Sequence, residues 1–189
     1  MKFVLGKKLN ASQIFLEESR RPTAVTLVEV FPNRVTRVKS REGKDGYDAV
    51  QLEQKKEFRV AAAELANFKV GDLIGLELFQ EGDKIKVSGV SKGKGFQGPV
   101  KKWGFRGRLS ATHGTKHELR TLGSVGSSEP DHVRKGRKMA GRMGGQRVTV
   151  RNLKIVKIDK DNNIMAVKGA IPGRRGTLLE IKTIDAGRH

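Results

Sequence analysis

The sequence contains no cysteine, which excludes disulfides and thiolate metal sites, zinc knuckles included. It also lacks long apolar runs: nowhere do hydrophobic residues continue for the roughly 18 positions that a membrane-spanning helix needs. The apolar run near the N-terminus gives way to Lys7 and Lys8, so no secretory signal is expected. These absences predict a soluble protein and agree with a reducing cytoplasm.

Acidic residues are scarce as well. The 189 residues include 39 Lys and Arg against 20 Asp and Glu, for a formal charge of +19. Such self-repulsion brings no benefit to a free domain, so the sequence predicts a polyanionic partner. The length and the 36% apolar content suffice for one modest hydrophobic core.

Alternating apolar and polar residues predict a mainly β fold. We expect strands at 23–30, 34–39, 47–54, 73–79, 84–90, 148–150, 153–158, 164–168 and 177–184. The first two strands are expected to pair through Pro32 and Asn33, and 73–79 and 84–90 to form a hairpin. Only 60–68 is typical of a helix. Because the strand-rich parts flank a different kind of segment, residues 1–91 and 147–189 are expected to form one small, discontinuous β-barrel.

The segment at 92–146 follows neither pattern. Between residues 92 and 151 there are 15 basic and 3 acidic residues, a net of +12, together with 12 glycines. Basic side chains on phosphates give salt-dependent affinity, and glycine lets a backbone approach a surface closely. The sequence therefore predicts a long, irregular basic extension, inserted between strands, that a nucleic acid orders. A disordered, solvated tract remains the alternative.

Aromatic and methionine residues stand among these cations. Phe96, Trp103 and Phe105 are spaced as a stacking surface for unpaired bases would require. The alternative is a small satellite core made by Trp103 and Phe105. Met139 and Met143 lie between glycines, which favours flexible apolar contacts over a buried helical stripe.

Two patterns in the sequence resemble enzyme motifs. Residues 93–100 (GKGFQGPV) match both the dinucleotide and the kinase glycine pattern, but Pro99 and the residues after it predict no amphipathic helix. Neither H-R-D nor D-F-G occurs in the chain. His113 and His117 have the i, i+4 spacing of a metal pair without a third ligand, and contacts to phosphate or sugar are an equal alternative to plain solvation. We expect no catalysis, cofactor, metal or small-molecule substrate.

Several ordered motifs resemble the universal L-three family of bacterial large ribosomal subunit proteins. They are Gly6-Lys7-Lys8-Leu9, Gln13-Ile14-Phe15, Ser91 to Gly98, Thr112-His113-Gly114, Gly123-Ser124-Val125-Gly126, Lys138-Met139-Ala140-Gly141 and Val167 to Gly173. The resemblance spans almost the whole chain.

The resemblance implies a translation-protein-type barrel and a cytoplasmic location in the ribosome. It implies that the extension threads into large-subunit (23S-type) rRNA near its 3′ end, helps nucleate assembly, and reaches toward the peptidyl transferase centre with residues 137–146. Partners implied by the family are the large-subunit proteins numbered fourteen and nineteen. The expected rRNA-binding residues are Lys92, Lys94, Phe96, Lys101, Lys102, Trp103, Phe105, Arg106, Arg108, His113, Lys116, His117, Arg120, Arg134, Lys135, Arg137, Lys138, Met139, Arg142, Met143 and Arg147.

The chain departs from the family pattern at three places. Asn10-Ala11-Ser12 replaces Gly-Met-Thr, so the resemblance does not fix the local turn at these residues. Arg142 stands where some relatives carry a methylated glutamine, and could pair with an RNA phosphate instead. Lys102 replaces the usual arginine, which keeps the charge but loses bidentate geometry.

Two other functions compete with a ribosomal role. A chromosome- or messenger-binding module would need only phosphate contacts from the same basic segment. A nucleotide-dependent enzyme would use the glycine motif at residues 93–98. Preference for large-subunit RNA over duplex DNA separates the first from a ribosomal protein, and binding of ATP or NAD would reveal the second.

Overall fold

The computed structural model describes residues 1–15, 21–110, 112–114, 117–129 and 131–184. Contacts divide the chain into two compact units, one made of Met1–Ser91 and Arg147–His189, the other of Lys92–Gln146. The predicted mainly β class is confirmed, because strands dominate the secondary structure. No helix in the described part of the chain is long and apolar enough to cross a membrane.

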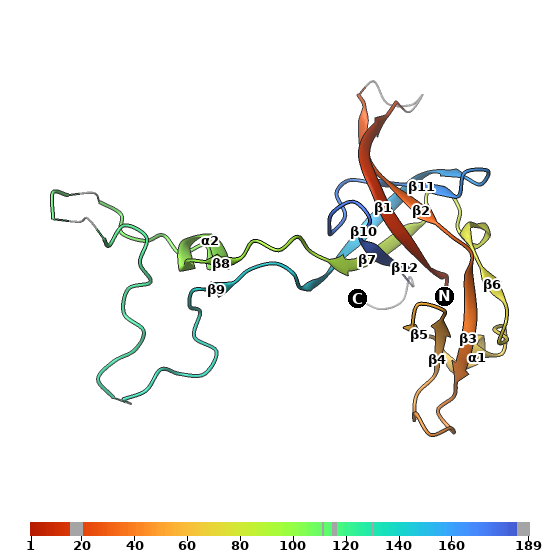
Figure 1. Ribbon diagram of the computed structural model, residues 1–189, viewed down its shortest axis with the longest axis horizontal. Coiled ribbons are helices and arrows are strands. Elements are labelled where there is room, and N and C mark those ends of the chain that lie inside the picture. The colour runs from red at the N-terminus through yellow and green to blue at the C-terminus, as the bar shows by residue number, and fades with distance from the viewer. Residues whose placement is uncertain (16–20, 111, 115–116, 130, 185–189) are drawn as a thin grey trace. The chain divides into compact units, whose positions relative to one another are not determined.

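Six strands of the first unit close into a barrel (Figure 1). Their order around the barrel is β1, β12, β7, β10, β11 and β2, and every neighbouring pair is antiparallel. The bounds are β1 (Phe3–Ile14), β2 (Thr23–Val30), β7 (Lys84–Val90), β10 (Arg147–Asp159), β11 (Ile164–Lys168) and β12 (Leu178–Thr183). The strands expected at 23–30, 84–90 and 164–168 are confirmed at those bounds.

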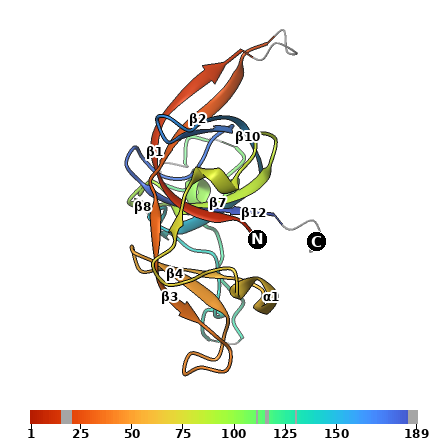
Figure 2. The same cartoon turned by 90° about the vertical axis from the view of Figure 1, so that its right-hand side faces the viewer.

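The same unit, in which Figure 2 labels β3 and β4, contains a four-stranded sheet in the order β5, β4, β3, β6. The sheet consists of β3 (Asn33–Lys39), β4 (Ala49–Leu52), β5 (Lys56–Arg59) and β6 (Leu73–Ile74), with the short helices α1 (Ala62–Leu65) and η1 (Leu76–Leu78) nearby in the chain. The second unit contains β8 (Phe96–Gln97), α2 (Pro99–Trp103) and β9 (Gly141–Arg142).

Strand β1 joins two hydrophobic cores. Successive side chains of a strand point to opposite faces. Val4 accordingly packs with the barrel interior, while Phe3 and Leu5 pack with the core of the four-stranded sheet. Phe3 stacks on Phe58 of β5 with ring centroids 4.6 Å apart. The start of β1 is therefore buried on both faces, which explains its unbroken apolar run.

Sequence patterns missed β1 itself. Asn10, Ala11 and Ser12, where the resemblance left the local turn open, belong to this strand, and the pairing of β1 with β2 shifts register between Lys8 and Ala11. A bulge of this kind absorbs an irregular sequence without ending the strand.

The two predicted strand pairings are wrong. Strand β2 pairs with β1 and β11, whereas β3 pairs with β4 and β6. The chain changes sheet at Asn33, whose buried side-chain amide donates to the backbone oxygens of Leu5 (3.1 Å) and Phe31 (2.7 Å). These bonds satisfy the amide and fix the change of direction after Pro32.

The predicted hairpin of 73–79 with 84–90 does not form either. Only Leu73 and Ile74 are strand, followed by η1, and β7 pairs with β10 and β12. Buried Leu76 and Phe79 join the barrel core from this connection, so its apolar residues serve packing rather than strand pairing. The helix expected at 60–68 shortens to α1.

Candidate nucleic-acid interface

The described residues of the unit Lys92–Gln146 carry exposed charge and form no hydrophobic core of their own. Within its described residues, Pro99 alone is buried. The predicted cations there are exposed, apart from half-buried Lys102: Lys92, Lys94, Lys101, Arg106, Arg108, Arg120, Arg134, Lys135, Arg137, Lys138 and Arg142. Lys116 lies outside the described residues. A segment without apolar cover gains little from its own packing, so it presents its charges to a partner.

A narrow backbone ribbon forms the base of this segment. The Lys94 amide donates to the Met143 oxygen, and the Met143 amide donates to the Gly95 oxygen, both at 2.9 Å. Beyond these bonds, Phe96 of β8 pairs in antiparallel register with Arg142 of β9. Two predicted interface residues, far apart in sequence, thus become neighbours.

Trp103 ties α2 to the returning strand of the ribbon. Its indole N–H donates to the backbone oxygen of Met139 at 2.7 Å. The Nζ atoms of Lys102 and Lys138 lie 5.1 and 5.6 Å from the indole ring. Cations near an aromatic face are attracted by its quadrupole. The structure therefore brings the Trp103 ring together with two ammonium groups that can bind phosphate.

The stretch after α2 folds back on itself at Gly107. The φ of Gly107 is +70°, and a Cβ atom there would lie 2.2 Å from the Leu119 oxygen. The Arg108 amide donates to the same oxygen at 3.2 Å, and the Arg108 guanidinium pairs with Glu118. Arg108 is thus committed in part to a partner within the chain.

The histidines lie in this folded-back stretch. His113 and His117 are exposed, and both occupy turns rather than one helix. Their i, i+4 spacing in the sequence would place two imidazoles on one metal only in a helix, and these two residues lie in turns. The described residues include no group of three or more His, Cys, Asp or Glu side chains suited to a metal ion.

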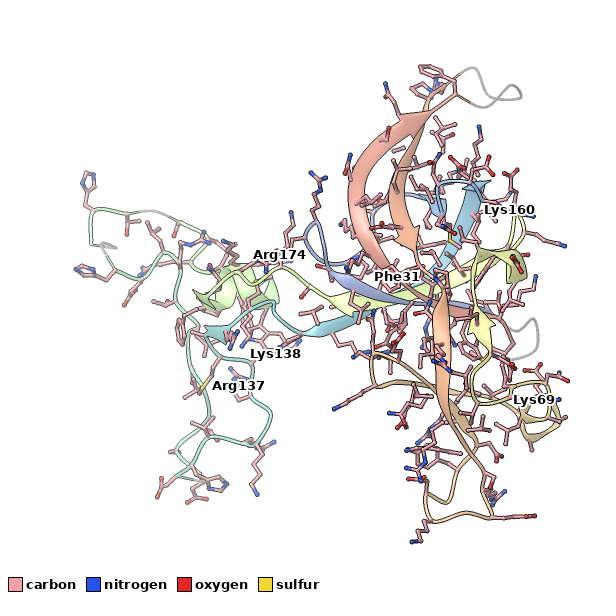
Figure 3. The ribbon with its side chains drawn as sticks, turned by 45° about the vertical axis from the view of Figure 1, so that its right-hand side comes forward. Phe31, Lys69, Arg137, Lys138, Lys160 and Arg174 are labelled. Carbon is pink, nitrogen blue, oxygen red and sulfur yellow. The ribbon has the colours of Figure 1, made fainter. Side chains whose placement is uncertain are left out.

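A second irregular stretch carries Arg134 to Lys138. The Arg137 guanidinium donates to the backbone oxygen of Ser124 at 2.6 Å, which ties residue 137 back to residue 124. Figure 3 labels Arg137 and its neighbour Lys138 here. His132, Arg134 and Arg137 line a small hollow with Val125, Gly126 and Ser127. The hollow offers three nitrogen-bearing side chains and exposed backbone, a combination suited to a phosphate or a sugar.

The aromatic residues do not form the satellite core considered above. Phe96 is 77% exposed and Trp103 is 44% exposed, while Phe105 is half-buried. Large apolar rings that remain in water offer surface to a ligand. Base stacking by these rings remains an expectation.

The helix α2 was not expected. It begins at Pro99, which suits the first helical position because proline has no N–H to satisfy, and it ends at Gly104 with φ +73°. Its five residues are far shorter than the helix that follows a dinucleotide-binding motif. The glycine motif at residues 93–98 thus leads into a single turn of helix.

Arg147 belongs to the barrel unit, as the first residue of β10. Its guanidinium pairs with Glu180 of β12, and Lys56 reaches the same carboxylate at 3.4 Å. Burial would raise the pKa of Glu180, but the hydrogen bond and positive charge of Arg147, helped by Lys56, keep that pKa below its ordinary value.

Sequence patterns also missed a pair of lysines near Glu180. Lys86 of β7 and Lys182 of β12 lie directly opposite each other in the sheet. Polar and apolar residues alternate along both strands in the sequence. Which residues face each other depends on strand order and register. Those are set by the barrel.

Comparisons with known proteins find similarity to ribosomal proteins along nearly the whole chain. A family model described as "Ribosomal protein L3" matches residues 72–165. The large ribosomal subunit protein uL3 of Thermosipho melanesiensis is 43% identical over 99% of this chain and 100% of its own length. The uL3 proteins of Pseudomonas fluorescens (40% identical, 98% of each chain) and Acinetobacter baylyi (43%, 92% of this chain and 93% of the relative) are similar throughout.

Proposed function

The chain belongs to the ribosomal protein L3 family, and from this premise we propose that Lys92–Gln146 is the part that binds large-subunit rRNA directly. Members of this family are structural components of the large ribosomal subunit in the bacterial cytoplasm, and they are not enzymes. The protein therefore acts in translation as part of a ribonucleoprotein.

One observation carries the proposal: a unit of 55 residues exposes nearly all its cations while burying only one described side chain. RNA neutralises such a segment and supplies the surface against which it becomes ordered. Many of its glycines, Gly126 among them, have open space where a Cβ atom would stand, so RNA can approach the backbone closely.

We further propose a role in the subunit for each part of the protein. The barrel, which is similar to the translation-protein type, anchors the segment. The segment threads into rRNA near the 3′ end of the molecule and helps nucleate subunit assembly. Residues 137–146 extend toward the peptidyl transferase centre, where they hold RNA in place without performing the reaction. Neighbouring large-subunit proteins, numbers fourteen and nineteen among them, would also contact the protein.

Trp103 provides a direct test because it is the only tryptophan of the chain. Intrinsic fluorescence of the full-length protein is titrated with large-subunit rRNA at about 0.15 M salt, and then with duplex DNA of equal phosphate concentration. We expect a saturating change with rRNA that the DNA does not reverse. Because about ten phosphate contacts make affinity fall by orders of magnitude with rising salt, a steep salt dependence should accompany it.

The competing chromosome- or messenger-binding module predicts another result. Phosphate contacts alone would give comparable affinity for the DNA and the rRNA, and full exchange between them. Free protein after sedimentation of ribosomes through a moderate-salt wash would likewise contradict the ribosomal assignment.

A further inference from the structure

Two barrel strands place a pair of lysines directly opposite one another. Lys86 of β7 and Lys182 of β12 are partners in an antiparallel pair of strands. Side chains in that position leave the sheet from the same face, and like charges there destabilise it. The barrel therefore carries a local repulsion that an anion would relieve.

No acidic residue of the described chain supplies that anion. Glu180 lies two residues before Lys182 on β12, and so on the same face, but its carboxylate already pairs with Arg147 and Lys56. Neither Lys86 nor Lys182 makes an ion pair with another described residue. Glu180 is thus already occupied by two cations, and Lys86 and Lys182 have no ion-pair partner among the described residues.

The surroundings of Lys182 strengthen the attraction for an anion. Its Nζ lies 4.6 Å from the ring centroid of Phe58, which is fully buried and stacks on Phe3. Burial, followed by the positive charge of Lys86, lowers the pKa of Lys182. A charge that is partly removed from water interacts more strongly with a counter-ion than a fully solvated one does.

We propose that Lys86 and Lys182, with Arg147 beside them, form a phosphate-binding site on the outer face of the barrel that takes the backbone of RNA. The site is additional to Lys92–Gln146, and the inference rests on the proposed binding of large-subunit rRNA. Lysine ammonium groups bind phosphate oxygens as point charges, and the Arg147 guanidinium can donate to them in parallel pairs of hydrogen bonds. The single negative charge of Glu180 offsets only part of the positive charge of Arg147, Lys56, Lys86 and Lys182. The remaining positive charge suits the same ligand.

The test compares two double variants of the full-length chain. Lys86→Gln with Lys182→Gln removes the site. Lys160→Gln with Lys168→Gln removes the same charge from exposed positions at the turn after β10 and at the end of β11, and Figure 3 labels Lys160. Affinity for large-subunit rRNA is measured over a range of salt concentrations. A third variant, Lys101→Gln with Arg106→Gln, reports on the basic segment.

We expect the slope of log affinity against log salt to become shallower by about 1 to 2 in the site variant, because each phosphate contact contributes about 0.9. Its affinity should fall about threefold more than that of the control. The single variant Lys86→Gln, which leaves the contact of Lys182 with Phe58 in place, should raise the thermal unfolding midpoint by about 1 to 3 °C, since it removes repulsion.

Each contrary result has a distinct meaning. A site variant that equals the control, while Lys101→Gln with Arg106→Gln weakens binding, overturns the barrel site and leaves the proposed function standing. A wild-type chain without preference for rRNA over duplex DNA contradicts both. A lowered midpoint for Lys86→Gln with an unchanged salt slope would show a purely structural lysine and also overturns the site.

Discussion

Gly144 lies against the backbone of Lys92 so closely that a Cβ atom on Gly144 would stand 2.1 Å from the Lys92 oxygen. The φ of Gly144 is +72°, a conformation that costs other residues energy. This contact lies next in the chain to the hydrogen bonds that join Met143 to Lys94 and Gly95 and close the base of the basic segment. Position 144 therefore requires glycine, both because of its positive φ and because a Cβ atom would collide with the Lys92 backbone.

Gly144→Ala should open the base of the segment without unfolding the barrel. The methyl group cannot avoid a backbone atom, so the ribbon must shift and the two bonds between residues 94–95 and 143 must lengthen. Amide hydrogen exchange of Lys94 and Met143 should accelerate, and rRNA affinity should fall several-fold. Gly126→Ala is the matched control for the hydrogen-exchange measurement, because a Cβ atom there meets nothing within 4 Å. Equal exchange rates in both variants would refute the argument.

Trp103 should matter both for its N–H and for its ring. Trp103→Phe removes the bond to the Met139 oxygen but keeps an aromatic face for Lys102 and Lys138, whereas Trp103→Leu removes both. A hydrogen bond contributes about 1 kcal/mol and a base stacked on an aromatic ring about 1 to 3 kcal/mol. We therefore expect a modest loss of rRNA affinity for Phe and a clearly larger one for Leu, measured by filter binding. Equal losses would show that the ring contacts no base.

The carboxylate of Glu180 should make the barrel sensitive to acid. Its folded pKa lies below the ordinary 4.5, so its contribution to stability is complete above about pH 4.5 and disappears as the pH falls through the folded pKa. Glu180→Gln should lower the free energy of unfolding by about 1 to 2 kcal/mol at pH 7, since it leaves Arg147 and Lys56 without their partner. Urea unfolding from pH 7 to pH 3 should show this difference shrinking.

Glu53→Gln is the control for Glu180, because Glu53 is exposed in the turn between β4 and β5. The free energy of unfolding of the Glu53→Gln variant should stay within about 0.5 kcal/mol of that of the wild type at neutral pH. A difference between Glu180→Gln and wild type that persists unchanged at pH 3 would mean that the ion pairs are not its cause.

Deleting residues 92–146 should leave a folded barrel. Val90 and Arg147 are partners in the β7–β10 pair, so a short linker can join the flanks, and neither hydrophobic core contains a residue of the deleted segment. We expect cooperative thermal unfolding near the wild-type midpoint, together with loss of most rRNA affinity and impaired subunit assembly. A product without a cooperative transition would show that the segment is needed for folding.

Local sequence patterns predict a structural feature correctly where the cause of that feature lies in residues that are neighbours in the chain. Strand β11 is a short run of apolar residues, Ile164 to Val167, that follows the polar turn at 159–163 and ends at Lys168, and its bounds follow from that local pattern. The charge and glycine content at 92–146 likewise indicates a segment that cannot build a core. These features depend on neighbours in the chain, so composition and periodicity reveal them without any knowledge of the fold.

The remaining features depend on partners distant in sequence, and the tertiary structure decided them. Phe3 lies in a strand because Phe58 and the second sheet cover it, and Asn33 redirects the chain through the Leu5 oxygen. Lys86 faces Lys182 only because β7 and β12 are neighbours in a closed barrel. Sequence alone determined where the charge is concentrated and which family the chain resembles. Long-range pairing and register determined which side chains meet, because alternation gives a strand two faces but does not choose its neighbours.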